Sequence, residues 1–144
     1  MDPVSKILDE KSGELLKIDG GASVIDAVRR MVGANVGSLL VTEDDEIVGI
    51  VTERDYLRRV ALEDRDENEA AVREIMSGPL VVVGLETTIE ECMALMTERR
   101  IRHLPVVDEE KVVGLVSIGD LVKFQSKQQN FEIQYLTDYI TTAG

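Results

Sequence analysis

Apolar positions over roughly the first 60 residues predict a short helix, then a strand, a helix, two strands and a further helix. Apolar residues at intervals of three and four are typical of a helix packed on one side, and short aliphatic runs bounded by turn residues are typical of buried strands. The predicted elements are a helix at 3–11, strands at 15–18, 38–42 and 47–51, a helix at 23–32 capped by Ser23 and ended by Gly33, a polar hairpin turn at 43–46, and a helix from Thr52.

The same pattern then occurs a second time. Residues 49–55, Gly-Ile-Val-Thr-Glu-Arg-Asp, return 65 positions later as residues 114–120, Gly-Leu-Val-Ser-Ile-Gly-Asp. The match needs no gap between about residues 15 and 57, and residues 4–8 resemble residues 72–76 at an offset of 68. An internal repeat of this kind indicates one structural unit present in two copies. We therefore predict a first repeat at 1–62, a polar connector at 63–71, a second repeat at 72–125 and a C-terminal helical extension at 126–144.

The second copy follows the plan of the first. Thr88 with Glu91 forms the sequence pattern of a capping box, which predicts the start of a helix. The remaining predicted elements of this copy are strands at 80–83, 104–107 and 111–116 and a helix from Ser117.

The last predicted helix continues as an apolar stripe that holds four of the five aromatic residues of the chain. Its members are Leu121, Phe124, Phe131, Tyr135, Leu136, Tyr139 and Ile140. The stripe fits a helix that lies back on its own domain, and it fits a helix at a dimer interface. We favour the dimer, because the two repeats already supply a full core without this segment.

Length and composition narrow the class of protein. Two units of about 60 residues would each be marginal alone, so the halves are expected to share a core. That core should be aliphatic, because 44% of residues are hydrophobic and only 3% are aromatic. No apolar run is long enough to span a membrane, and the first residues lack the features of a secretion signal, so we predict a cytoplasmic protein. The single cysteine, Cys92, is predicted to be a buried apolar side chain.

The net charge of −12 argues against two classes of partner. An acidic surface repels phosphate backbones and anionic lipid, so neither nucleic acid nor a membrane is expected as a partner. Solubility is the simplest explanation of the acidity. A few basic residues gathered in a cleft could still bind a small anion.

Thr52 with Asp55, and Ser117 with Asp120, each place a hydroxyl three residues before an acid at the start of a predicted helix. This spacing serves a capping box, and capping alone could explain both pairs. The same position is also a phosphate site, because unpaired N–H groups and the helix dipole favour anions there. The hydroxyl would donate to a phosphate and the carboxylate would accept from ribose hydroxyls, so a nucleoside phosphate fits the pair better than a simple anion.

The repeated Gly-h-h-Thr/Ser-x-x-Asp signature (h, apolar), together with Ile-Arg-His-Leu-Pro-Val-Val-Asp at 101–108, closely resembles a tandem pair of CBS domains. The resemblance runs from about Val4 to Phe124. It implies an α+β fold of two pseudo-symmetric β-α-β-β-α units packed sheet to sheet as one CBS-pair module, with the C-terminal helical extension added. It also implies two clefts between the repeats and a homodimer.

The resemblance further implies that the clefts bind adenosine ligands, most often AMP, ADP or ATP and less often S-adenosylmethionine or NAD(H). Acids matching Asp55 and Asp120 hold the ribose, and hydroxyls matching Thr52 and Ser117 approach the phosphates. The base contacts backbone near Val82 and along the segment from Ile101 to Pro105.

The two copies differ in charge. Arg102 and His103 align with Gly37 and Ser38 of the first copy. In relatives, basic residues at this position of the second copy reach toward the ligand held by the acid of the first. The resemblance therefore implies that the Asp55 cleft, with Arg54 adding charge, takes the more phosphorylated ligand. The Asp120 cleft, where Gly119 permits close approach of the backbone, would suit a less charged ligand such as AMP.

Catalytic and metal chemistry have little support in the sequence. No base accompanies a nucleophile, and no phosphate-binding Gly-Lys loop or dinucleotide fingerprint is present. His103 has no second His or Cys at metal-ligand spacing. We therefore predict a regulatory module, not an enzyme, without a resident cofactor or metal. Adenosine ligands would change its packing and so control an unidentified partner protein. The competing hypothesis is a dimerisation or interaction scaffold whose clefts are vestigial.

Overall fold

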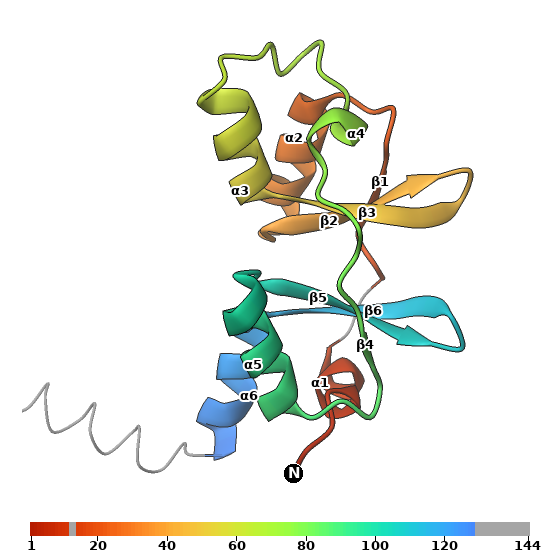
Figure 1. Ribbon diagram of the computed structural model, residues 1–144, viewed down its shortest axis with the longest axis vertical. Helices are drawn as coiled ribbons and strands as arrows, with labels where there is room; N and C mark the ends of the chain where they lie inside the picture. The colour runs from red at the N-terminus through yellow and green to blue at the C-terminus, as the bar shows by residue number, and fades with distance from the viewer. Residues whose placement is uncertain (12–13, 129–144) are drawn as a thin grey trace, which may run out of the picture. The chain divides into compact units, whose positions relative to one another are not determined.

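The computed structural model describes residues 1–11 and 14–128 of the chain, and its elements are labelled in Figure 1. In chain order they are α1 (Ser5–Glu10), β1 (Lys17–Asp19), α2 (Val24–Ala34), β2 (Ser38–Glu43), β3 (Glu46–Thr52), α3 (Glu53–Tyr56), a π-helical turn (Leu57–Ala61), α4 (Val72–Ile75), β4 (Val83–Gly84), α5 (Ile89–Arg99), β5 (His103–Asp108), β6 (Lys111–Ser117) and α6 (Ile118–Gln128).

The described chain divides into two compact units. Residues 14–82 form one, called here the middle unit, and residues 1–11 with 83–128 form the other, called the outer unit. Helix α1 therefore belongs to the unit built mainly from the second repeat, and α4, which opens the second repeat, belongs to the unit built from the first. The sequence repeats and the compact units divide the chain at different points.

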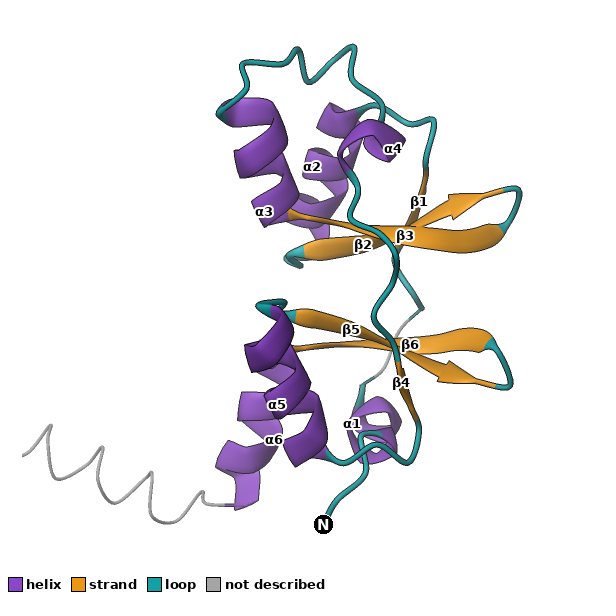
Figure 2. Cartoon of the chain, in the orientation of Figure 1, coloured by secondary structure: helices purple, strands orange, loops and turns teal. Residues whose placement is uncertain are grey.

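Each unit contains a three-stranded sheet with its helices on one face (Figure 2). In the middle unit β1 runs parallel to β2, and β2 runs antiparallel to β3; β4, β5 and β6 repeat this order in the outer unit. Both antiparallel ladders shift register at one place, between Val41 and Thr42 and, 65 positions later, between Val106 and Val107. The repeat in the sequence is therefore a repeat of backbone register, and the predicted α+β fold is confirmed.

The cores are aliphatic, as the composition predicts. The larger fully buried side chains of the middle unit include Ile18, Val24, Leu39, Val41, Val51, Val72 and Ile75. Those of the outer unit include Val4, Ile89, Leu104, Val106, Val116 and Leu121. Val72 and Ile75 of the first set lie in α4, and Val4 of the second set lies at the start of α1. Each short helix therefore completes the core of its own unit.

Two signature glycines make room for these short helix segments. A Cβ at Gly114 would lie 2.5 Å from Leu8 Cδ2, and a Cβ at Gly49 would lie 2.8 Å from Met76 Sδ and 3.2 Å from the Ser77 carbonyl oxygen. Gly49 and Gly114 are 65 positions apart, and Leu8 and Met76 are the matching residues of the two short helices. The glycine of the signature thus has a packing reason in both copies.

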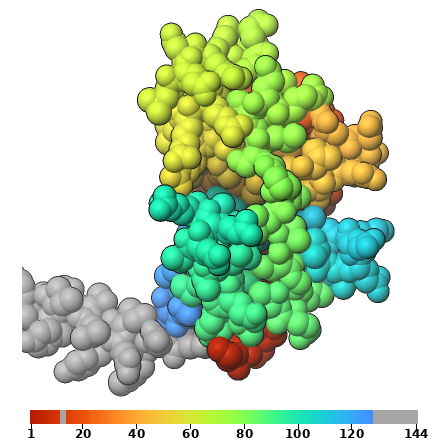
Figure 3. Space-filling view, in the orientation of Figure 1, coloured from red at the N-terminus to blue at the C-terminus, as the bar shows by residue number. Residues whose placement is uncertain are grey.

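Most predicted element starts are confirmed by the capping contacts. Ser23 Oγ accepts a hydrogen bond from the Asp26 N–H, and Thr88 forms the expected reciprocal box with Glu91. Both hairpins turn through two polar residues at positive φ, Asp44–Asp45 and Glu109–Glu110. Each turn projects from its own unit (Figure 3, orange and cyan).

Three predicted boundaries were wrong. Helix α2 passes Gly33 and ends one residue later, because Asn35 adopts the left-handed conformation that closes it. Strand β4 begins only at Val83, since residues 80–82 form no ladder and only Val83 and Gly84 pair with β5. Strand β1 begins at Lys17 and not at residue 15. The helix predicted from Thr52 includes a π-helical turn over 57–61. The predicted C-terminal stripe beyond Gln128 lies outside the described residues.

Candidate functional site

The first hydroxyl–acid pair lies where β3 passes into α3. Thr52 caps the helix: its Oγ1 accepts from the Asp55 N–H at 3.1 Å, and its own N–H donates to Asp55 Oδ2 at 2.9 Å. Ser77 Oγ donates to the other carboxylate oxygen, Oδ1, at 2.7 Å. Asp55 is 8% exposed. Both of its oxygens are therefore engaged by neighbouring groups of the middle unit.

The second pair has the same helix-start geometry in the outer unit. The Ser117 N–H donates to Asp120 Oδ2 at 2.9 Å, and the Asp120 N–H donates to Ser117 Oγ at 3.1 Å. Lys11 Nζ also donates to Asp120 Oδ2, at 2.9 Å. The hydrogen bonds from the Ser117 N–H and from Lys11 Nζ both reach Oδ2. The Asp120 side chain is 23% exposed, so its second oxygen is the freer of the two.

Burial alone would raise the pKa of Asp120. The hydrogen bonds from Ser117 and from the Lys11 ammonium favour the charged form more strongly, and together they hold the pKa below its ordinary value. The carboxylate is therefore ionised at neutral pH and can accept hydrogen bonds from a bound molecule.

Ser77 and Lys11 occupy corresponding places in the two units, and the sequence prediction included neither. Ser77 follows α4, its N–H donates to the Ile50 carbonyl at 2.9 Å, and its hydroxyl binds Asp55. Lys11 follows α1, and its Nζ binds both Asp120 and the carbonyl of Leu115, at 2.9 Å each. Ile50 and Leu115 are 65 positions apart. The Lys11 ammonium group thus binds both a strand carbonyl and the acid of its unit, whereas Ser77 uses its N–H for the carbonyl and its hydroxyl for the acid.

Several predicted residues of the second copy gather at the start of α6. His103 pairs with Ser117 across the β5–β6 ladder, and the Arg102 carbonyl accepts the Ile118 N–H at 2.8 Å. Pro105 lies opposite Leu115 in the same ladder, and the Ile101 N–H closes the end of α5 on Met96.

Gly119 is also at this helix start, and it is exposed. A Cβ there would touch only Ser117 Oγ, at 3.5 Å, which is ordinary contact. The described fold of the outer unit therefore does not itself require glycine at this position.

The remaining predicted residues belong to the middle unit. Arg54 lies in the first turn of α3 beside Asp55. Val82 is 41% exposed and lies in the segment that leads to β4. The predicted contribution of Arg102 and His103 to a ligand at Asp55 stays a prediction.

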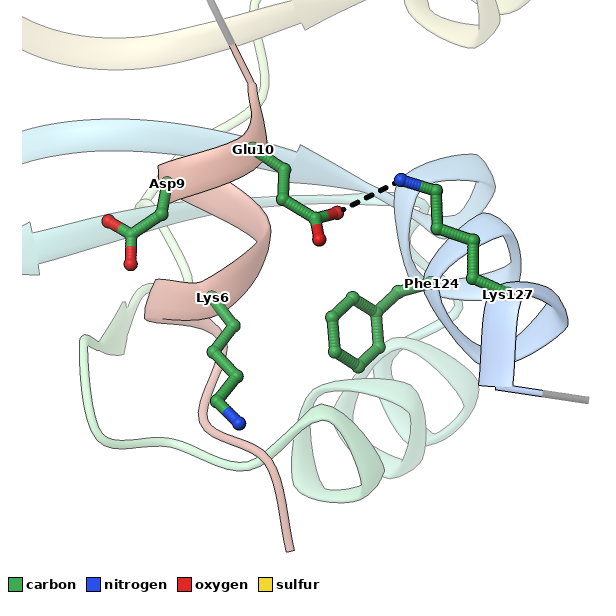
Figure 4. Close-up of a pocket in the computed structure, with 5 residues that line it drawn as sticks. All are labelled: Lys6, Asp9, Glu10, Phe124 and Lys127. Atoms are coloured by element: carbon green, nitrogen blue, oxygen red, sulfur yellow. Dashed lines mark hydrogen bonds and ion pairs between the residues drawn. The ribbon is translucent and has the colours of Figure 1, made fainter.

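A separate pocket of about 460 Å³ lies between α1 and α6 in the outer unit (Figure 4). It is lined by Lys6, Asp9, Glu10, Phe124 and Lys127, and none of these is a predicted site residue. Lys127 Nζ pairs with Glu10 Oε2 at 3.3 Å, and Lys6 Nζ pairs with Asp2 at 2.7 Å. Its ammonium groups are thus already neutralised by acids of the same unit.

Other reactive chemistry is limited. Within the described part of the chain, no group of three or more His, Cys, Asp or Glu residues is arranged to hold a metal ion. Cys92 is fully buried, and burial, with the nearby Glu91 charge, raises the pKa of its thiol to about 11. A thiol of this kind is unreactive at neutral pH, which agrees with the apolar role predicted for it.

The fold, with its two hydroxyl–acid helix starts, defines a tandem repeat of a known ligand-binding module. The family model "CBS domain" matches the sequence twice, over residues 4–62 and 72–127, so the chain belongs to the CBS-domain family. CBS pairs are regulatory modules that commonly bind adenosine ligands.

Two relatives of known sequence match most of this chain. The CBS domain-containing protein CBSX3 of Arabidopsis thaliana, a mitochondrial protein, is 41% identical over 82% of this chain. The protein YhcV of Bacillus subtilis is 30% identical over 88% of this chain. The chain spans 60% of the length of CBSX3 and 90% of that of YhcV.

Solved structures give the same result. A Burkholderia ambifaria MC40-6 protein, described by its CBS domains and a role in signal transduction, is 44% identical with a TM-score of 0.86. The match covers 89% of this chain and 96% of that one. The Agrobacterium tumefaciens protein ATU1752 is 30% identical with a TM-score of 0.80, covering 84% of this chain and 91% of that one. Among the residues that the structure describes, no helix is both long and apolar enough to cross a membrane.

Proposed function

We propose that this chain is a regulatory module that binds AMP, ADP or ATP through the helix starts at Asp55 and Asp120. Each acid would accept hydrogen bonds from ribose hydroxyls, while Thr52 or Ser117 and the helix N–H groups face a phosphate. Val82 and the segment from Ile101 to Pro105 would contact the base. S-adenosylmethionine and NAD(H) are the less favoured ligands of the same chemical class.

One observation carries the proposal, namely the geometry of Asp120. An ionised carboxylate with one freer oxygen stands at the start of an 11-residue helix, three residues after a hydroxyl. A carboxylate that only capped the helix would need no more than the contact it makes with Ser117. The exposed Gly119 beside it leaves room for a ligand to approach the backbone.

Regulation would follow from differential binding. A ligand shifts an equilibrium between two arrangements only if it binds one of them more tightly. In this proposal the nucleotide favours one packing of the protein, which changes the surface offered to a partner protein or to a second copy in a homodimer. Among the structural relatives, a CBS-CP12 protein from cyanobacteria is described as hexameric, at 33% identity. A relative that contains CBS domains is therefore described as an oligomer, which supports the expectation of self-association.

The proposal is tested by thermal unfolding with AMP, ADP, ATP, S-adenosylmethionine, NADH and GMP. At about one hundred times the dissociation constant, a bound ligand adds roughly 2.7 kcal/mol of stability. We expect adenosine compounds to raise the melting temperature and GMP to have little effect. Asp120→Asn should reduce this response, whereas Asp9→Asn, an exposed acid of the same unit, should leave it unchanged.

A second function remains open because of one feature of the middle unit. Both oxygens of Asp55 are already engaged by Thr52 and Ser77, as expected for a residue that only holds a helix in place. If no adenosine compound raised the melting temperature, the chain would be better described as a dimerisation or interaction scaffold. Its partners would then be sought directly by cross-linking of the purified chain.

A further inference from the structure

We propose that Lys11 makes the Asp120 site, defined as Ser117, Asp120 and Lys11, selective for a phosphorylated adenosine ligand over adenosine itself. The inference rests on the proposed function and adds a specificity residue that lies outside both signature motifs. The juxtaposition that carries it is the Lys11 ammonium, held on Asp120 Oδ2 at 2.9 Å from a position 109 residues away in the chain.

Lys11 is held in place and still has binding capacity left. It lies just past the end of α1 in extended backbone, with its N–H on the Ile7 carbonyl at 3.0 Å. Its Nζ donates twice, to Asp120 and to the Leu115 carbonyl. An ammonium group has three N–H donors, so one remains for a further acceptor. The Lys11 side chain is 46% exposed, which allows a ligand to reach that donor.

Charge decides what the third donor would accept. A phosphate next to an isolated carboxylate is repelled, because two negative charges at close range raise each other's energy. The Lys11 ammonium neutralises Asp120 and adds a charge-assisted hydrogen bond, which is stronger than one between neutral groups. The site can then hold a ribose on the carboxylate and a phosphate beside it.

The middle unit offers a built-in comparison. At the corresponding place Ser77 donates a hydrogen bond to Asp55 from a hydroxyl, which carries no charge. If Lys11 were only a structural partner of Asp120, as Ser77 could be for Asp55, its removal would affect phosphorylated and unphosphorylated ligands alike. If Lys11 binds the phosphate, removal would affect AMP and leave adenosine nearly unchanged.

The experiment compares the dissociation constants of AMP and adenosine by titration calorimetry on the full chain. The variants are Lys11→Met, which removes the charge, and Lys11→Arg, which keeps it. Lys6→Met is the matched control, since it removes one exposed ammonium from α1, the helix that Lys11 follows. Asp120→Asn identifies which binding event belongs to the Asp120 site. An ion pair as exposed as that of Lys11 contributes little to stability, so these variants are expected to fold.

We expect Lys11→Met to weaken the binding of AMP at the Asp120 site about tenfold, as the loss of one charge-assisted hydrogen bond implies. The binding of adenosine should weaken by less than about twofold. Lys11→Arg should retain most of the preference, and Lys6→Met all of it. The wild-type ratio of AMP to adenosine affinity should fall as salt is added, and that of Lys11→Met should fall less.

An unchanged ratio in Lys11→Met, with AMP and adenosine still bound, would overturn the role of Lys11 and leave the proposed function standing. A wild-type chain that binds neither compound would overturn both. Tighter binding of both ligands by Lys11→Met would show that the lysine competes with them for Asp120, which also contradicts the proposal. The salt titration needs no variant, and a wild-type ratio that did not change with salt would count against the proposal.

Discussion

Asp55 and Asp120 stand at the same point of two sheets with the same register, yet their surroundings differ. In the middle unit Asp55 is buried and satisfied at both oxygens, one of them by Ser77. In the outer unit Asp120 is partly exposed, is bound at one oxygen and is paired with the Lys11 ammonium. The backbone of the repeat is thus retained, while the group paired with the acid changes from a neutral hydroxyl to a charged ammonium. A duplicated module can in this way offer two sites of different ligand preference.

The largest expected effect concerns the helix that follows each signature. Leu121 of α6 is fully buried, whereas Tyr56, 65 positions earlier, is partly exposed and donates its hydroxyl to Glu67 at 2.5 Å. Leu121→Ala should lower the free energy of unfolding by about 2–5 kcal/mol, as large-to-small core changes do. Tyr56→Phe should lower the free energy of unfolding by clearly less than Leu121→Ala does. Urea unfolding followed by circular dichroism measures both, and equal losses would show that the two helices are buried alike.

The signature glycines of the two units should also differ in how much an added methyl group destabilises the fold. Gly49→Ala should destabilise by about 1–3 kcal/mol, because the added methyl meets the Ser77 carbonyl oxygen, which is backbone. Gly114→Ala should cost less, since the three atoms nearest to the methyl all belong to the Leu8 side chain, which can rotate. Urea unfolding of the two variants would give this order, and the reverse order would mean that Leu8 has no room to move.

Helix caps differ between the units in a third way. Thr88 both accepts from Glu91 and donates its own N–H to the Glu91 carboxylate, while Ser23 only accepts, from the Asp26 N–H at 3.3 Å. Alanine removes only the accepting hydroxyl at either position, and the contact to Thr88 Oγ1 is the shorter, 3.1 Å against 3.3 Å. Thr88→Ala should therefore cost about 1 kcal/mol, and Ser23→Ala should cost less. Melting temperatures of the two variants, measured side by side, provide the test. A larger loss for Ser23→Ala would contradict the prediction.

The smallest expected effect is a pH dependence. Because the folded pKa of Asp120 lies below its ordinary value of 3.8, its ionised form stabilises the fold above that pH. This contribution is lost as the pH falls through the folded pKa. The stability difference between wild type and Asp120→Asn should therefore shrink in acid. A carboxyl NMR titration should also show the Asp120 pKa rising in Lys11→Met, and an unchanged pKa would mean that Lys11 does not bind Asp120 in solution.

The repeat, the order of elements, the caps at Ser23 and Thr88 and the aliphatic core could be predicted because each depends on local spacing. Local spacing also identified the hydroxyl–acid pairs as helix caps, a role the hydrogen bonds of Thr52 and Ser117 confirm. Their role in ligand binding stays a prediction.

The contacts that distinguish the two acids were not predictable in the same way. Lys11 meets Asp120 across 109 residues, and Ser77 meets Asp55 across 22 residues. No periodic pattern links such positions. The one available signal was that Lys11 and Ser77 both follow the short segments that match at an offset of 68. The short length of β4 could not be predicted from the hydrophobic pattern either, because residues 80–82 are aliphatic but form no ladder.

The position of the short helices has a consequence for synthesis of the chain. All segments of the middle unit lie in one continuous stretch, so the whole unit has been synthesised once Val82 has been added. The outer unit needs α1 from the beginning of the chain and β6 from near the end of the described residues, and α1 must wait for its partners. Contacts between distant parts of a chain form slowly, so the middle unit should fold first during translation. Segment 14–82 would then be a better candidate for an independently expressed fragment than the first repeat at 1–62.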